Sequence, residues 1–408
     1  MPFDRMERWL ESEVAALDAA GTRKGRESVI VEWLPAEGDR GPRVRLRGEG
    51  DTPFLRMNSN GYLGLARHPD VCAAEEAAVR RYGTGPGAVR FISGTFAPHR
   101  ELERRLAAFH DRPAAMAYSS AYAAMLGVLP PLVAEGTAVI SDELNHNCII
   151  NALRLARPAW KHVYPHLDMG ALEAALGKAA ADGARRALVV TDGVFSMRGD
   201  HAPLDAIVGI ARRHDDRFPD NAVVIADDSH GVGALGDTGR GSEEVTGARA
   251  DVLVATLGKA LGVNGGYVVG SQALVDFLRE KSPFYVYSNP ITPAEAAAAA
   301  RAVEVLDSPA GRDRLARLRG LTARLRQGLV ALGLETLAGE HPVVPLLVRD
   351  TARTRALVAH LRARGVLATG LAYPVVPAGE EEIRFQLSAE HTPADVDEVL
   401  EAVAGFGG

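Results

Sequence analysis

The chain lacks the features that mark secreted and membrane-spanning proteins. It has only two cysteines, Cys72 and Cys148, which are too few for a disulfide framework. Charged residues at Asp4 to Arg8 interrupt any apolar core of a secretory signal. No uncharged apolar run approaches ~18 residues, the length that spans a bilayer. We therefore predict a protein of the reducing cytoplasm with no membrane-spanning segment.

Positive charge is also scarce relative to negative charge. The 46 Lys and Arg residues against 52 Asp and Glu residues leave a net charge of −6, whereas general nucleic-acid binders carry excess positive charge. The 12 histidines are scattered without the spacing of metal ligands, so neither a nucleic-acid partner nor a metal site is predicted. The 408 residues are 47% hydrophobic and show no internal repeat, which indicates a globular chain of roughly two to three domains.

Short apolar runs separated by helix-like stretches recur in the middle of the chain. The clearest are residues 137–140, 187–190, 222–226, 251–255 and 267–269. Runs without alternation are typical of strands covered on both faces, and intervening helices imply right-handed crossovers in a largely parallel sheet. We therefore predict an α/β fold, with a large domain at residues 55–295 built around this sheet.

The two ends of the chain show other patterns. Apolar residues between Met6 and Leu17 recur at helical spacing, so residues 1–54 are predicted to be an N-terminal helical arm. Residues 296–408 begin with an Ala-rich segment and then mix helix and strand patterns. The last helix is predicted to open at Thr392-Pro393, because Thr is a favourable N-cap and Pro suits the first helical position. A smaller α+β domain is predicted there.

Two motifs directly follow predicted strands, where ligands collect in a parallel sheet. The stretch from Asp227 to His230 places an acid and a histidine at a strand end, although an isolated motif of this kind more often caps a helix. Lys259 lies among small residues after the next strand. Burial there would lower the pKa of its ammonium toward that of a Schiff-base nucleophile, although a lone lysine is more often a surface residue.

A third motif, from Tyr118 to Ala124, leads two hydroxyls into helix-compatible residues. Free N–H groups at a helix N-terminus make an anion site, so this motif is a candidate phosphate cradle. Each motif alone is weak evidence. Together with the histidine in the stretch Asp142 to His146, they describe how a protein holds pyridoxal 5′-phosphate (PLP): a covalent lysine, a partner for the ring nitrogen, a phosphate site and a stacking group.

Over about residues 55 to 405 the chain resembles the α-oxoamine synthases, fold-type I enzymes that use PLP. The resemblance rests on the motifs at residues 59–65, 89–95, 145–146, 191–197, 227–230, 256–259 and 383–384. Within the family it is greatest to the 2-amino-3-oxobutyrate CoA ligases, on residues 91–95, 287–290, 373–377 and 388–392. The resemblance implies a large PLP-binding domain with a mostly parallel sheet and a smaller C-terminal α+β domain.

The resemblance also implies roles for individual residues in chemistry at the ring. Lys259 would bind PLP covalently and later move the substrate Cα proton, and Asp227 would keep the ring nitrogen protonated. His146 would stack on the ring, while His230 and Ser196 would bond its phenolic oxygen.

Other positions would hold the phosphate and the substrate. Ser120, Ala121, Tyr122 and Thr256 would contact the phosphate, and Ser288 would reach it from the partner subunit of a homodimer with shared active sites. Asn60 and Arg384 would bind the carboxylate of the amino acid, Arg384 as a two-point fork.

The implied reaction joins a small amino acid, glycine before alanine or serine, to an acyl thioester of CoA or of an acyl carrier protein. The alternatives within the fold are an 8-amino-7-oxononanoate synthase-like or specialised acyltransferase, an aminotransferase or lyase, and a silent partner subunit. The last is disfavoured because Lys259 is retained. At six positions the chain has a residue that is unusual among these relatives: Gly61, Ala123, Met125, Cys148, Leu167 and Glu382. These departures put the identity of the substrate in question and not the cofactor chemistry.

Overall fold

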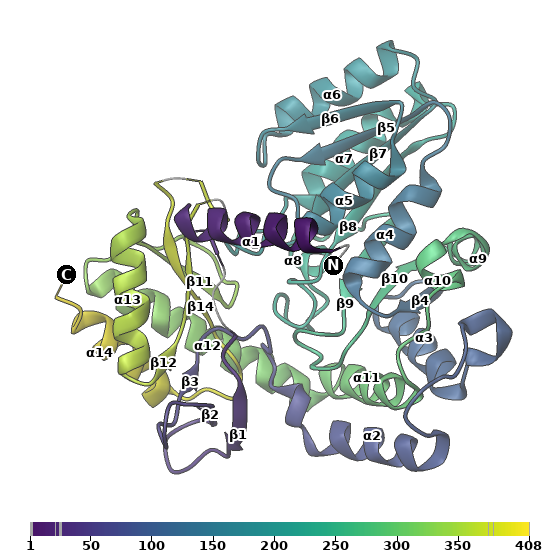
Figure 1. Ribbon diagram of the computed structural model, residues 1–408. Coiled ribbons are helices and arrows are strands. Elements are labelled where there is room, and N and C mark those ends of the chain that lie inside the picture. The colour runs from purple at the N-terminus through teal and green to yellow at the C-terminus, as the bar shows by residue number, and fades with distance from the viewer. Residues whose placement is uncertain (1–2, 21, 24–26, 374, 378, 408) are drawn as a thin grey trace.

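A seven-stranded sheet forms the centre of the computed structural model, which describes residues 3–20, 22–23, 27–373, 375–377 and 379–407 (Figure 1). The strand order is β4-β10-β9-β8-β7-β5-β6. Only β10 runs antiparallel to its neighbours, which confirms the mostly parallel sheet. The strands are β4 (Ala114–Tyr118), β5 (Thr137–Asp142), β6 (Trp160–Tyr164), β7 (Arg186–Asp192), β8 (Ala222–Asp227), β9 (Val252–Thr256) and β10 (Gly266–Gly270).

Helices cover both faces of this sheet, which is why its strands have uninterrupted apolar sequences. Successive strand residues point to opposite faces, so Val190 packs with α4 and α5 whereas Val189 packs with α6 and α7. Both faces are therefore buried, as expected for a parallel sheet. The covering helices include α4 (Ala121–Leu132), α5 (Asn147–Ala156), α6 (Met169–Ala181), α7 (Leu204–His214), α9 (Gln272–Lys281) and the short α10 (Pro283–Val286).

The Ala-rich segment forms helix α11 (Pro293–Leu306), which packs against α2 (Pro69–Tyr82) and α3 (Ala97–Phe109). Its alanines are small enough to let neighbouring helices approach closely, and all of them except Ala297 are buried. Short elements complete the surroundings of the sheet: η1 (Leu65–Arg67), a single π-helical turn η2 (Arg90–Gly94), η3 (Asp215–Arg217) and α8 (Ser242–Thr246).

A smaller antiparallel sheet, in the order β11-β14-β13, forms the C-terminal lobe. Its strands are β11 (Val343–Leu347), β13 (Thr369–Leu371) and β14 (Glu382–Gln386), accompanied by α12 (Pro309–Ala331), α13 (Thr351–Ala363) and α14 (Pro393–Ala404). Thr392 caps α14 in a capping box with Asp395, so the predicted helix start is confirmed. Along β14, Ile383 and Phe385 join the hydrophobic core, which directs the alternate residues to the opposite face.

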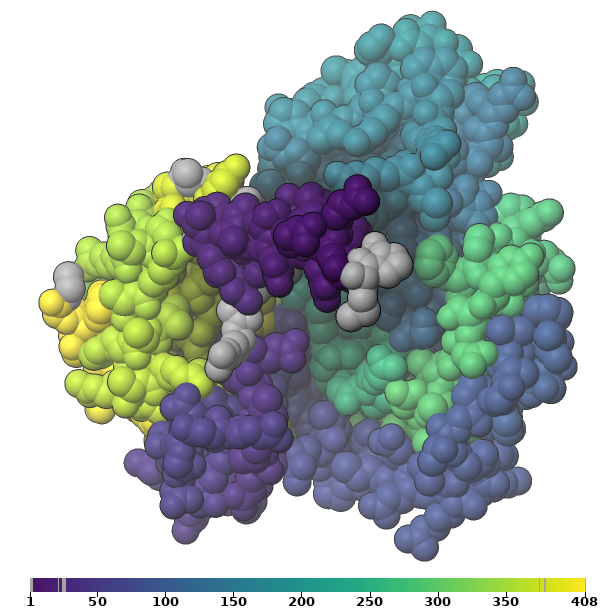
Figure 2. All heavy atoms as spheres, viewed as in Figure 1, coloured from purple at the N-terminus to yellow at the C-terminus, as the bar shows by residue number. Residues whose placement is uncertain are grey.

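The N-terminal helix α1 (Asp4–Ala19) buries none of its residues and lies across the space between the C-terminal lobe and the large sheet (Figures 1 and 2). The chain then forms a hairpin of β1 (Ile30–Leu34) and β2 (Arg43–Leu46), so the predicted arm is only partly helical. Strand β3 (Leu55–Arg56) pairs with β12 (Val366–Leu367). The domain limits at 54/55 and 295/296 stay predictions. No helix within the described ranges combines the length and the apolar character needed to cross a bilayer.

Candidate active site

A cavity of about 170 Å³ lies at the carboxyl ends of the central strands. These ends converge because β5, β7, β8 and β9 run parallel. The structure therefore brings together every residue predicted to bind the cofactor except Ser288. The cavity is lined by Ser120, Ala121, Tyr122, His146, Ser196, Asp227, His230, Thr256 and Lys259, together with Cys148, Asp192, Val194 and Ser229.

Lys259 lies in the turn that follows β9. Burial lowers the pKa of its ammonium, and the nearby carboxylates Asp227 and Asp192 oppose that shift. The turn is tight, because Gly262 has a φ of +71° and a Cβ there would lie 2.3 Å from the backbone nitrogen of Ala66. Only glycine accommodates both the dihedral angle and the close approach, so the turn holds Lys259 enclosed.

The two neighbouring acids after β8 have different surroundings. Asp227 lines the cavity, where its Oδ1 accepts from the Ser229 backbone at 3.1 Å and its Oδ2 accepts from Cys148 Sγ at 3.4 Å. Asp228 points away and accepts from the backbone N–H of Ser242 at 2.8 Å, at the start of α8. Burial raises the pKa of Asp228 to about 7. The helix-capping interpretation of this motif therefore applies to Asp228, and Asp227 is available to a ligand.

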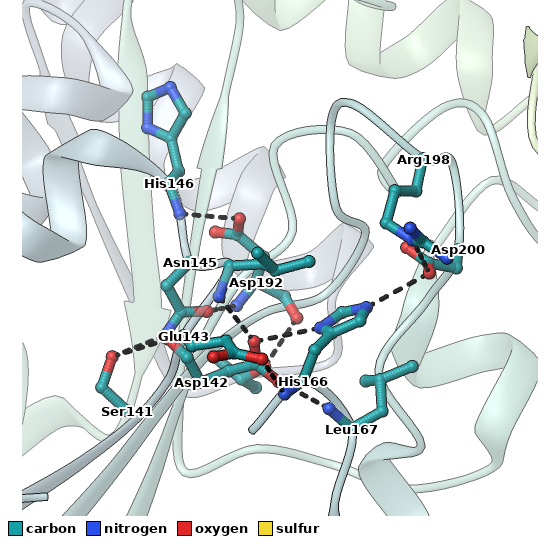
Figure 3. A network of polar contacts seen from close by, with 12 residues as sticks. Ser141, Asp142, Glu143, Asn145, His146, His166, Leu167, Asp192, Arg198 and Asp200 are labelled. Carbon is teal, nitrogen blue, oxygen red and sulfur yellow. Dashed lines mark hydrogen bonds and ion pairs between the residues drawn. The ribbon is translucent and has the colours of Figure 1, made fainter. Parts of the chain in front are cut away.

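His146 is the N-cap of α5 and is held there both by its backbone N–H and by its ring Nδ1. Its backbone N–H donates to Asp192 Oδ2 at 2.9 Å, and Figure 3 shows the ring pointing away from this network of polar contacts. The ring Nδ1 accepts from the Cys148 backbone at 3.3 Å and lies 3.0 Å from Cys148 Sγ. Asn145 joins the ends of β5 and β7, because its side chain contacts Ser141 Oγ and the Asp192 backbone.

Further from the cavity, His166 fastens the loop that carries Ser196 (Figure 3). Its Nδ1 lies 3.0 Å from Asp142 Oδ1 and its Nε2 lies 3.2 Å from Asp200 Oδ2, which also accepts from Arg198. Burial alone lowers the pKa of His166, but the hydrogen bonds and charges of the two carboxylates outweigh it and raise the pKa to about 9. A charged His166 thus ties the end of β5 to the loop after β7.

His230 has two buried neighbours that the sequence analysis did not single out. The hydroxyl of Tyr62 lies 2.7 Å from His230 Nδ1, and His341 Nε2 lies 2.9 Å from the His230 carbonyl oxygen. His341 Nδ1 accepts from the Val343 backbone, so the proton on Nε2 is the donor to His230. Tyr62 belongs to the motif at residues 59–65 that carries the family resemblance, whereas no local sequence pattern predicts a role for His341.

The N-terminus of α4 has the features of the predicted phosphate cradle. Ser120 is its N-cap and accepts from the Ala123 backbone at 3.0 Å. The first backbone N–H groups of a helix have no partner within the helix, and those of Ala121 and Tyr122 belong to residues that line the cavity. A Cβ at Gly266 would lie 2.1 Å from the Ala121 nitrogen, so glycine in β10 lets the helix end sit directly against the sheet.

Arg384 and Asn60, the predicted carboxylate ligands, are not among the described residues that line the cavity. Arg384 lies on β14 of the C-terminal lobe, and Asn60 lies between β3 and η1. Arg384 Nη1 donates to the Ser196 carbonyl oxygen at 2.9 Å, while its buried Nε has no partner in the described part of the chain. Gln386 Nε2 donates to Asn60 Oδ1, and Gln386 Oε1 is likewise buried without a partner among the described residues. Buried polar atoms are normally paired, so these groups indicate that a polar ligand binds beside them.

Ser288 lies outside the cavity. It is half-buried, and within the described part of the chain its Oγ forms only one hydrogen bond, to the neighbouring Asn289 carbonyl oxygen at 3.4 Å. The expectation that it reaches a phosphate therefore depends on a second copy of the chain.

Comparisons with known proteins agree with this geometry. The aminotransferase class I and II family matches residues 52–403. An 8-amino-7-oxononanoate synthase of Geobacter metallireducens is 41% identical over 91% of this chain and 92% of its own. The mitochondrial 2-amino-3-ketobutyrate coenzyme A ligase of Homo sapiens is 39% identical over 98% and 91%. A structure of serine palmitoyltransferase from S. paucimobilis with bound PLP and myriocin has a TM-score of 0.86 at 27% identity, covering 100% of this chain and 97% of the other.

These relatives cover nearly the whole chain. The 8-amino-7-oxononanoate synthase and the 2-amino-3-ketobutyrate coenzyme A ligase match it about equally well. The donor groups of the cavity fit PLP: an enclosed amine, a carboxylate for the ring nitrogen and a helix end for the phosphate. The resemblance predicted from the motifs is therefore confirmed. The chain belongs to the aminotransferase class I and II family and, within it, to the α-oxoamine synthases, which are PLP-dependent acyltransferases of fold type I.

Proposed function

We propose that this chain transfers an acyl group from a thioester of CoA or of an acyl carrier protein to the Cα of a small amino acid, with glycine as the first candidate. The support comes from a half-buried lysine and a buried acid in one cavity, together with a half-buried arginine that bonds a residue of that cavity. The buried Nε of this arginine has no partner among the described residues. The arginine supplies the means to bind an amino-acid carboxylate next to the reacting centre. An aminotransferase is disfavoured because the residue proposed to stack on the cofactor is the histidine His146, and not a phenylalanine, tyrosine or tryptophan.

Each cavity residue has a role that its surroundings support. PLP, when bound, withdraws electrons from the substrate Cα and so makes the proton on that carbon acidic. Asp227, held by the Ser229 backbone and Cys148, would keep a proton on the ring nitrogen. Lys259 would bind the PLP aldehyde covalently and, once displaced by the substrate, take the Cα proton. Its lowered pKa increases the fraction of neutral amine that can do so.

The remaining residues orient the substrate and exclude water. Arg384 would hold the substrate carboxylate through the guanidinium edge that Ser196 leaves free, and Gln386 with Asn60 offers further polar atoms beside it. The His146 ring would cover one face of the cofactor ring. His230, buried and fixed by Tyr62 and His341, would donate to the phenolic oxygen.

Covalent labelling tests the assignment of Lys259. The protein would be purified with PLP, reduced with borohydride and digested, and the labelled peptide would be identified by mass spectrometry. We expect the label on the peptide containing Lys259, no label in Lys259→Ala, and unchanged labelling in Lys161→Ala, which removes an exposed lysine. A label on another peptide would contradict the assignment.

A second assay separates acyl transfer from amino transfer. Thiol release from acyl-CoA, measured with glycine, alanine or serine as co-substrate, is expected to require both substrates. Amino transfer to an oxo acid under the same conditions is expected to stay at background. The opposite pattern would identify an aminotransferase on the same fold.

We also propose a homodimer with shared active sites. Phe91, Ile92 and Tyr287 are 66%, 68% and 82% exposed, and their segments η2 and α10 lie in contact, close in sequence to Ser288. The apolar side of α1 is exposed as well. Apolar surface of this extent is typical of a protein interface, so a second copy is its expected occupant.

Mixed dimers test the sharing directly. Lys259→Ala and Ser288→Ala chains, each impaired alone, would be unfolded together and refolded. If Ser288 acts across the interface, one site of the mixed dimer is intact and up to about half of the wild-type activity per mixed dimer returns. Activity that stays at the level of the separate variants, or an active monomer in light scattering, would contradict the shared site.

A further inference from the structure

A second cavity, of about 550 Å³, adjoins the Lys259 cavity, since Ser196 lines both. Its volume lies within the ~300–1,000 Å³ typical of small-molecule sites and exceeds what a small amino acid fills. Its walls include the apolar side chains of Leu144, Phe195 and Leu347. Because Arg384 bonds the Ser196 carbonyl oxygen, the proposed amino-acid site lies where the two cavities meet. The second cavity is thus positioned to hold the acyl chain.

Glu382 is the exceptional polar group in this second cavity. It is only 3% exposed, and its Oε1 is buried with no hydrogen-bond partner in the described ranges. It belongs to the same face of β14 as Arg384 and Gln386, because Ile383 and Phe385 occupy the core face. Alternate residues of a strand are about 7 Å apart, so Glu382 lies about 7 Å along the strand from the carboxylate-binding arginine.

The arginines of the second cavity are already paired with carboxylates. Arg198 Nε lies 3.1 Å from Asp200 Oδ2 and its Nη1 lies 3.4 Å from Glu380 Oε2, while Arg349 contacts Glu335 at 2.5 Å. Glu382 has no such partner among the described residues. Burial raises its pKa to about 7, with the charges of Arg384 and Arg198 acting in the opposite direction.

A buried acceptor without a partner discriminates among ligands. A hydroxyl or ammonium on the incoming chain would satisfy Oε1, whereas an apolar chain would leave the desolvated oxygen unpaired. Above a pH of about 7, where Glu382 is ionised, a terminal carboxylate on the acyl chain would place like charges together. The free-energy cost of binding the acyl chain is therefore lowest for a chain that carries a hydrogen-bond donor, higher for an apolar chain and highest for a chain that ends in a carboxylate.

We propose that Glu382 determines acyl specificity, so that the second cavity takes an acyl group bearing a hydrogen-bond donor and rejects one bearing a terminal carboxylate. This inference rests on the proposed acyl transfer and adds the chemical class of the acyl group. It also explains why the residue two positions before Arg384 is a glutamate, Glu382, whereas the ligases tend to carry an arginine there.

Three CoA thioesters with acyl chains of equal length test the proposal: 4-hydroxybutyryl-, butyryl- and succinyl-CoA, each with glycine. Wild-type kcat/KM, measured by thiol release, is expected to decrease in that order. Glu382→Gln, which keeps the shape and removes the charge, is expected to raise the succinyl-to-butyryl ratio roughly tenfold or more, mainly through KM. The control Glu380→Gln alters an exposed, ion-paired glutamate of the same cavity and should change that ratio less than about twofold.

Binding of unreactive thioether analogues of the three thioesters, measured by calorimetry, provides a readout that does not require turnover. Unchanged ratios in Glu382→Gln, in both kinetics and binding, would overturn the proposal. It would also be overturned if the variant changed the preference for serine over alanine and left the acyl ratios unchanged, because the second cavity would then hold the amino-acid side chain. A wild type that binds the analogues in the expected order but releases no thiol would contradict only the proposed reaction.

Discussion

Replacing Arg384 by lysine separates charge from geometry in the proposed carboxylate site. The guanidinium has two tasks: Nη1 donates to the Ser196 carbonyl oxygen at 2.9 Å, and the unpartnered Nε is left for a ligand. A lysine keeps the positive charge, but its single ammonium cannot present a planar fork to a carboxylate while it also holds Ser196. At least one charge-assisted hydrogen bond to the substrate is therefore lost in Arg384→Lys.

Such a bond contributes about 1.5–3 kcal/mol, which corresponds to roughly a 10- to 150-fold decrease in kcat/KM for the amino acid. The assay is thiol release with the amino acid varied at saturating thioester, and then with the thioester varied at saturating amino acid. We expect a higher KM for the amino acid and a KM for the thioester within about twofold of wild type. Arg198→Lys is the matched control, because Arg198 is ion-paired with Asp200 and Glu380 and lines the second cavity. An unchanged amino-acid KM in Arg384→Lys would refute the assignment.

Three further predictions concern stability and cofactor binding. The pKa of His166 is raised to about 9 from 6.5 by its two carboxylates, so its stabilisation is complete below pH 6.5 and lost as pH rises through 9. His166→Gln should lower the free energy of unfolding by roughly 2 kcal/mol at pH 6 and by much less near pH 10, as denaturant titrations would show. Cys148→Ala removes a donor to Asp227 Oδ2 and should shift the pH dependence of the bound cofactor's visible absorbance while PLP still binds; an unchanged titration would contradict that contact. Gly266→Ala places a Cβ 2.1 Å from the first backbone nitrogen of α4 and should weaken PLP binding at least tenfold in a fluorescence titration, since helix and strand must separate; wild-type affinity would show that the cradle tolerates the methyl group.

Much of the fold is encoded in short segments, which is why it was predictable. The uninterrupted apolar runs became β5, β7, β8, β9 and β10 with ends within one or two residues of those predicted, because strands buried on both faces need no polar alternation. Thr392 caps its helix as its local sequence indicates. The cofactor residues follow strand ends, and parallel strands bring their carboxyl ends together.

Other features depend on contacts between distant parts of the chain. Asp228 accepts a hydrogen bond from the Ser242 backbone, and this distant contact leaves Asp227 as the acid that faces the cavity. The support of His230 by His341 joins residues 111 positions apart. The hairpin within residues 1–54 follows from the pairing of β1 with β2 and not from the helical pattern that precedes it.

The sequence by itself indicated five of the seven strands of the large sheet, the start of α14 and the residues proposed to bind the cofactor. Each of these is specified by apolar periodicity or by a motif of a few neighbouring residues. Only the tertiary structure decided that three polar atoms along one face of β14 have no partner among the described residues: Arg384 Nε, Gln386 Oε1 and Glu382 Oε1. Whether a buried polar atom is satisfied depends on every element that packs around it, and those elements come from both lobes of the molecule. That property, which no local pattern encodes, is the basis for the substrate sites that we propose.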